Sequence, residues 1–226
     1  MIPAAVQRWV FAVCFFALLP FLGCTHVIPV KTDPDAMPED YSLFKRQPER
    51  YAFPVAVVIG DETRKFTVSQ HGTVFPVGEA LFELSTSSFA EIFRSCNVVP
   101  DIRSAPYGTD RILVLRFDPR SAFRYGITMF HDHTAEIRLA GEMYDRKNRL
   151  LWKGTATGTR KANISEAAAQ QMSGGSSGGI FAFMTPPQDP QDVALGDMVH
   201  DALSMALEEM KYELVVKARK AILPPK

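Results

Sequence analysis

The pattern of apolar and polar positions along this chain predicts a series of strands and helices that begins at Phe53. Phe53–Ile59 is apolar and rich in β-branched residues, which predicts a buried strand. Apolar residues then recur at helical spacing from Gly78 to Ser95, which predicts an amphipathic helix. A second buried strand is predicted at Arg111–Phe117. The chain therefore begins its folded part with strand, helix and strand.

The clearest strand signal lies between Thr134 and Tyr144, where apolar and polar side chains alternate strictly. Arg146–Asn148 turns the chain, and Leu150–Thr159 repeats the alternation, so the two segments predict an antiparallel hairpin with one buried face. A last helix is predicted over Val193–Lys217. The predicted fold class is α+β, with an antiparallel sheet of about four strands and two helices packed on one face.

The first 23 residues have the architecture of a secretory signal peptide. Arg8 precedes an apolar run, Trp9–Leu22, which ends at Gly23-Cys24 before polar sequence begins. This run is shorter than the ~20 apolar residues that a membrane-spanning helix needs. A transmembrane anchor and an ordinary secretory signal peptide are the two alternatives. We expect cleavage before Cys24.

The residues Phe21-Leu22-Gly23-Cys24 resemble the lipobox of bacterial lipoproteins, with Phe21 where that family usually has Leu. The resemblance implies that a diacylglyceryl group is attached to the Cys24 sulfur and that the new N-terminus is acylated. Two or more acyl chains hold a protein stably at a membrane. Thr25 at the next position implies the outer membrane, with the domain facing the periplasm.

The expected organisation after cleavage is a tether, one domain and a short tail. Residues 24–50 are rich in proline and charge and lack apolar periodicity, which predicts a lipid-anchored tether that holds the domain off the membrane. Within it, Tyr41–Phe44 could dock back onto the domain. Residues 51–217 form the predicted single α+β domain, and residues 218–226 are expected to fray.

Charge and cysteine content narrow the classes of partner. The chain has 25 Lys and Arg against 25 Asp and Glu, so it lacks the basic excess typical of proteins that bind nucleic acid. Cys24 and Cys96 are the cysteines left after cleavage, and a lipid on Cys24 leaves no pair for an internal disulfide. Cys96 is expected at the end of the first helix as a small buried apolar residue.

His131-Asp132-His133 is the segment that most resembles a metal site. Alternate strand residues share a face, so the two imidazoles could bind one ion. Further ligands would have to come from His71, His200 or a carboxylate, and the spacing identifies none. We therefore interpret the segment as a polar bend. The sequence also lacks a Gly-x-Ser-x-Gly elbow and a phosphate-binding loop, and we predict no catalytic residue, metal or cofactor.

A glycine- and serine-rich stretch, residues 173–179, is followed by an apolar segment. That segment could fill the core or form an exposed tip that contacts a partner or the membrane, because exposed apolar patches usually mark interactions. The candidate tip residues are Ile180, Phe181, Phe183 and Met184.

The order of elements behind the lipobox resembles small Gram-negative envelope lipoproteins, such as YajG-like, lipopolysaccharide-assembly and transporter-auxiliary lipoproteins. The resemblance implies a non-enzymatic protein that binds a partner protein, a lipid or a glycan in envelope assembly or transport. A structural subunit of a larger envelope machine and a lipid-anchored hydrolase are the alternatives. A polar cleft with perturbed titratable groups would favour the hydrolase, and an uncovered sheet edge or apolar patch would favour binding.

Overall fold

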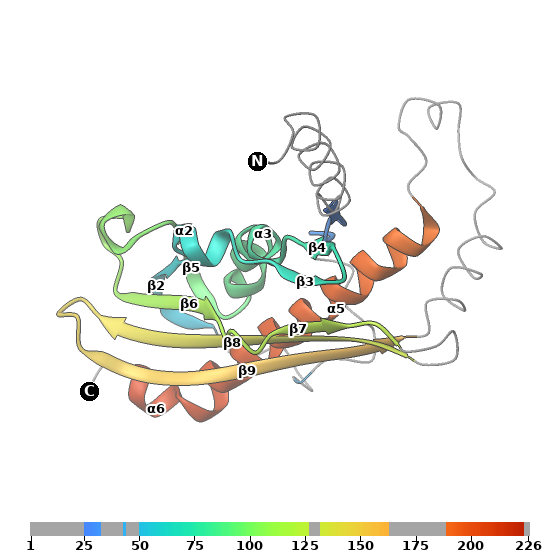
Figure 1. The fold of residues 1–226 in the computed structure, drawn as a ribbon. Coiled ribbons are helices and arrows are strands. Elements are labelled where there is room, and N and C mark those ends of the chain that lie inside the picture. Colours follow the sequence, from blue (N-terminus) through green and yellow to red (C-terminus); the bar gives the residue numbers. More distant parts are fainter. Residues whose placement is uncertain (1–24, 33–42, 44–49, 127–131, 163–188, 224–226) are drawn as a thin grey trace, which may run out of the picture.

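The computed structural model describes residues 25–32, 43, 50–126, 132–162 and 189–223. A large mixed sheet lies at its centre, with a small sheet and helices packed on one face (Figure 1). The strands of the large sheet are β2 (Tyr51–Val58), β5 (Phe93–Val99), β6 (Arg111–Phe117), β7 (Ala122–Arg124), β8 (His133–Asp145) and β9 (Leu150–Ala162). The small sheet contains β1 (His26–Val27), β3 (Val68–Gln70) and β4 (Thr73–Phe75).

Two helices supply most of the helical packing. They are α3 (Val77–Ala90) and the long α5 (Pro190–Tyr212), which continues through a π-helical turn, η4 (Glu213–Lys217), into α6 (Arg219–Ile222). Two shorter elements are α2 (Asp61–Arg64) and the 3-10 turn η2 (Ile102–Ser104). None of the helices in the described ranges is both long and apolar enough to span a bilayer.

The pairing of the strands explains their sequence patterns. Strand β2 lies between two parallel neighbours, β5 and β6, and is buried on both faces, which is why its sequence is apolar without alternation. Strand β8 pairs antiparallel with β6 and β7 on one side and with β9 on the other. Its alternation separates a core face, packed on α5, from an open polar face.

The predicted α+β class is confirmed, and so are the strands β2, β6, β8 and β9 and the last helix. The prediction of an antiparallel sheet of about four strands was wrong, because the sheet is mixed and has six strands. The difference comes chiefly from β5. The first helix ends at Ala90, and the residues expected to complete it form a strand parallel to β2 that includes Cys96.

Helix α5 approaches the hairpin closely where the hairpin has glycine. A Cβ atom added to Gly158 would lie 1.8 Å from the carbonyl oxygen of Ala202 and 2.6 Å from the backbone nitrogen of Ala206. The absence of a side chain at this position therefore allows the helix backbone to rest on β9.

The first described residues form part of the folded domain, although the sequence predicted a tether from residue 24. Strand β1 pairs in parallel with β4, and Ile28 and Val30 lie in the hydrophobic core. Their alternation with exposed neighbours lets two apolar side chains point inward, so proline content did not prevent packing. Residues 33–42 and 44–49 of the expected tether lie outside the described residues.

Candidate functional site

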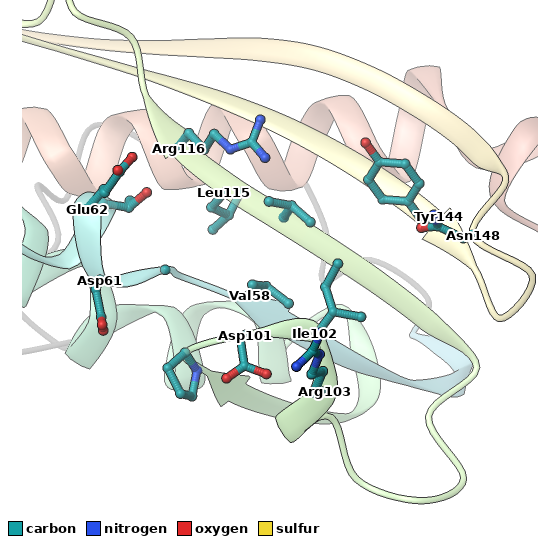
Figure 2. A pocket seen from close by; sticks show the side chains of 14 residues that line it. Val58, Asp61, Glu62, Asp101, Ile102, Arg103, Leu115, Arg116, Tyr144 and Asn148 are labelled. Atoms are coloured by element: carbon teal, nitrogen blue, oxygen red, sulfur yellow. The ribbon is translucent and has the colours of Figure 1, made fainter.

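A hollow of about 810 Å³ lies on the face of the large sheet opposite α3 and α5 (Figure 2). Its volume falls within the range of ~300–1,000 Å³ that is typical of ligand pockets. Its walls are α2, the residues that follow β5, and the end of β8 with the turn after it. Its floor comes from β2 and β6. The lining residues are Val58, Gly60, Asp61, Glu62, Thr63, Pro100, Asp101, Ile102, Arg103, Val114, Leu115, Arg116, Tyr144 and Asn148.

The floor of the hollow is apolar. Val58 and Val114 are buried there in a small second core together with Ala56 and Val99. Ile102 is 47% exposed, and Figure 2 shows its side chain directed into the hollow from η2. An exposed isoleucine over an apolar floor offers a contact surface to another molecule.

The rim of the hollow carries charges of both signs. Asp61, Glu62 and Asp101 contribute carboxylates, and Arg103 and Arg116 contribute guanidinium groups. The Arg116 side chain is 65% exposed, and its Nη1 atom lies 3.8 Å from Glu142 Oε2. An apolar centre with a polar rim is an arrangement that protein–protein interfaces commonly have.

Glu142, beside the hollow, and Asp101, in its lining, already accept hydrogen bonds within the fold. Lys153 Nζ donates to Glu142 Oε1 at 2.8 Å, and the Tyr144 hydroxyl donates to Glu142 Oε2 at 2.7 Å. These two hydrogen bonds hold the pKa of Glu142 below its usual value, and the bond from Lys153 has the larger effect. The bond to Glu142 raises the pKa of Tyr144. Both groups therefore keep their ordinary charge at neutral pH and are poor candidates for a catalytic acid or base.

Asp101 is held in a similar way. Its Oδ1 accepts the backbone N–H of Ser104 at 2.9 Å, and its Oδ2 accepts the Ser104 hydroxyl at 3.1 Å. The backbone hydrogen bond is the main reason why the pKa of Asp101 is lowered. Among the fourteen described residues that line the hollow there is no His, Cys or Ser. The lining does include the carboxylates of Asp61 and Glu62 and the hydroxyls of Thr63 and Tyr144.

Exposed apolar side chains also occur at one end of the molecule. Arg146 donates from Nε to Thr109 O at 2.7 Å and from Nη2 to Gly108 O at 2.8 Å, which ties the loop after η2 to the β8–β9 turn. Arg111 Nε donates to Ile222 O at 3.3 Å and so brings α6 to the same end (Figure 1). We call this the far end. Its exposed large apolar residues are Ile102, Tyr107, Leu150, Val216 and Leu223.

The opposite end of the molecule holds the N-terminal segment. His26 Nε2 lies 2.8 Å from Asp192 Oδ2, in the first turn of α5. Lys31 Nζ donates to Asp197 Oδ2 at 3.1 Å, and the buried His200 donates from Nδ1 to Lys31 O at 2.7 Å. Ser204 Oγ lies 3.3 Å from His200 Nε2 and is placed to donate to it. We call this the β1 end.

The small sheet connects the β1 end to the large sheet. The Tyr125 hydroxyl donates to Thr73 Oγ1 at 2.8 Å, and the rings of Phe75 and Phe123 lie 4.7 Å apart. Phe123 stands opposite Ala135 near the start of β8. The β1 end and the far end therefore lie near opposite ends of strand β8.

Two of the histidines that the sequence singled out, His71 and His133, lie beside Tyr125, and His200 makes different contacts. His133 begins β8, its ring 5.4 Å from that of Tyr125, whereas His200 contacts the N-terminal segment. His71 lies 6.1 Å from Tyr125 by ring centroids, and His131 is outside the described residues. Within the described ranges, no three His, Cys, Asp or Glu residues are grouped so that they could hold a metal ion.

Several other predicted residues have no structural outcome. Cys24 and the candidate tip residues Ile180, Phe181, Phe183 and Met184 lie outside the described residues, so their roles stay predictions. Cys96 lies half-buried in β5, where burial raises the pKa of its thiol to about 12. A thiol with so high a pKa is almost entirely protonated at neutral pH and reacts slowly.

Sequence reasoning missed both the hollow and the packing of the N-terminal segment. The hollow combines residues from five separate segments, none of which has an unusual pattern by itself. A signal for the second feature was present in the short apolar run Val27–Val30, three residues after Cys24.

No protein-family model matches the sequence, and a search of curated proteins gives no match. Among solved structures, a Xanthomonas campestris protein of the family DUF330 is 12% identical with a TM-score of 0.43, covering 87% of this chain and 94% of that chain. A Caulobacter crescentus protein described as a lipoprotein is 11% identical with a TM-score of 0.40, covering 65% and 86%. The Neisseria meningitidis lipoprotein GNA1162 is 14% identical with a TM-score of 0.31, covering 54% and 98%. The chain is thus distantly similar to proteins described as bacterial lipoproteins.

Proposed function

We propose that this chain is a lipid-anchored envelope protein, attached through Cys24 at the outer membrane and facing the periplasm, that binds a partner protein without catalysing a reaction. The observation that carries the proposal is that the segment after Cys24 and the hollow lie toward opposite ends of the domain. The residues that directly follow Cys24 are built into one end of the domain, and the hollow with its exposed apolar neighbours lies toward the other.

The anchoring half of the proposal rests on the sequence at Gly23-Cys24 and on the fixed position of the β1 segment directly after it. Removal of the signal peptide before Cys24 would place the lipidated residue two positions before the first residue of β1. The candidate tip at Ile180–Met184 precedes Asp189, where the described chain resumes next to the β1 end. We propose that the apolar side chains of the tip contact a partner or the membrane.

The binding half rests on the hollow. Its apolar floor and mixed rim fit a protein segment better than a small substrate, and Glu142 and Asp101 act as hydrogen-bond acceptors within the fold. A structural subunit of a larger envelope machine is the second candidate, because Tyr107 and Leu150 would be covered permanently in such an assembly.

The test uses a photo-crosslinking amino acid in place of Ile102 in cells that make the full chain. We expect one discrete crosslinked species from this position and none from a matched exposed position, Glu83 on α3, because Glu83 lies on the opposite, helical side. Equal crosslinking at the two positions, or none at Ile102, would contradict partner binding at the hollow.

The same cells test the anchor. The wild-type chain should fractionate with outer membranes and have the intact mass of an acylated protein that begins at Cys24. Cys24→Ser should leave the membrane fraction or remain unprocessed. An unmodified Cys24 in the mature wild-type protein would overturn the lipid-anchored function.

A further inference from the structure

We propose that the surface formed by β1 and the β3–β4 turn rests directly on the lipid bilayer, so that the domain is mounted against the membrane in one orientation. This inference rests on the proposed lipidation of Cys24. It identifies the membrane-facing surface of the domain, which the presence of a lipid alone would not define.

The length of chain between the lipid and the fold is the first argument. Thr25 alone separates Cys24 from β1, and the His26 backbone N–H donates to Gly72 O at 2.9 Å. Two residues span at most ~7 Å. The lipidated sulfur must therefore lie within a few residues' reach of β1 and of the turn at His71-Gly72.

The second argument is that this segment is fixed in the domain. His26 is paired with Thr73 in the small sheet, and Ile28 is 1% exposed in the core. The Lys31 carbonyl accepts a hydrogen bond from the buried His200, and the Pro29 carbonyl lies so close to Gly196 that a Cβ there would be 2.6 Å away. The segment cannot serve as a flexible spacer without leaving these contacts.

The composition of the surface is the third argument. Residues 25–27 and 69–74, which surround the attachment point, include no Asp, Glu, Lys or Arg. Val27 is 58% exposed there, beside exposed Ser69 and His71. These residues carry no Asp, Glu, Lys or Arg whose charge would have to be removed from water at a costly approach to lipid, and the neighbouring Asp192 carboxylate is paired with His26 Nε2 at 2.8 Å.

This orientation fixes the distance of the hollow from the membrane-facing surface. Thr73 contacts Tyr125, whose neighbour Arg124 is paired with Thr134 near the start of β8. The hollow adjoins Glu142 on the same strand, eight residues further along. At ~3.4 Å per residue, the hollow is offset from the β1 end by up to ~27 Å. The far end therefore points away from the anchoring surface.

The test measures membrane proximity at two matched exposed positions of the full, lipidated chain. Ser69→Cys and Lys147→Cys are each made in a Cys96→Ala background, labelled with bimane, and reconstituted in phosphatidylcholine vesicles that contain headgroup spin-labelled phosphatidylcholine. We expect several-fold stronger quenching at position 69, on β3, than at position 147, in the β8–β9 turn. A Gly/Ser linker of about ten residues between Thr25 and His26 should remove this difference, because it restores a flexible tether.

Intact mass spectrometry of the same samples separates the two possible failures. Equal quenching at the two positions in acylated protein would overturn the membrane-facing surface and leave the lipid anchor standing. A mature chain without acyl groups would overturn the anchor and this inference with it. Unchanged melting temperatures of the labelled variants establish that the comparison is made on the folded domain.

Discussion

Lys211 and Glu208 form a charged pair inside the domain, on successive turns of α5. Lys211 is 1% exposed, is paired with Glu208, and donates from Nζ to Glu91 Oε2 at 2.6 Å. Burial raises the pKa of Glu208, and the hydrogen bond from Lys211 offsets part of that rise. The Lys211 ammonium group therefore offsets part of the free-energy cost of burying the Glu208 carboxylate in the folded state.

Lys211→Met should lower the free energy of unfolding by ~3–5 kcal/mol at neutral pH, because it leaves Glu208 buried without its cation. Adding Glu208→Leu should recover most of that loss. In the single variant the folded-state pKa of Glu208 exceeds its unfolded value of ~4.3, so stability should be full below that pH and fall as the pH rises through the raised pKa. Urea unfolding over a pH series measures both effects, and a single variant whose stability does not fall with pH would contradict the assignment.

Helix α5 and the β8–β9 hairpin meet through backbone contact at Gly158. Gly158→Ala should therefore destabilise the domain by ~1–3 kcal/mol or more, since the added methyl group meets the helix backbone, which cannot rotate away. Gly60→Ala is the matched control: its Cβ would lie 3.7 Å from Pro100 O, an ordinary contact, and the change should stay within ~0.5 kcal/mol. Thermal unfolding of both variants gives the comparison, and equal melting temperatures would show that α5 can shift off the hairpin.

The elements also show where sequence patterns are informative. The hairpin was predictable because β8 exposes one face, so its alternation records which side chains are buried. Strand β5 was not predictable, because buried and exposed residues do not alternate regularly along it. Phe93 also continues the helical spacing of apolar residues from the preceding helix. Strand β5 pairs in parallel with β2, and α3 separates the two strands in the chain. Local periodicity carries no information about a pairing between such distant segments.

The described part of the molecule extends from the β1 end to the far end, and residues 25–32 are packed into the β1 end. Ile28→Ala should lower the free energy of unfolding by ~2–5 kcal/mol, because Ile28 is fully buried in the main core. Val27→Ala, one residue earlier and exposed, should change it by less than ~0.5 kcal/mol. Denaturant unfolding of the two variants measures the difference. Similar small values would mean that the N-terminal segment contributes little to the stability of the domain.

The site could be predicted from the sequence only in part. Cys24 stays a prediction as the attachment residue, and it rests on a local signal, a Gly-Cys junction after an apolar run. The hollow was not predictable, because Val58, Ile102 and Tyr144 come together only through the mixed sheet and the loop after β5.

The contacts of the N-terminal segment also set an order of events during biosynthesis. His26 bonds a residue 166 positions later in the chain, and Lys31 bonds one 169 positions later. Neither contact can form until α5, the last long element to be synthesised, has emerged and reached the same compartment. Contacts so distant along the chain close slowly compared with the β8–β9 hairpin. A chain interrupted before residue 192 would therefore lack both of these contacts between the N-terminal segment and α5.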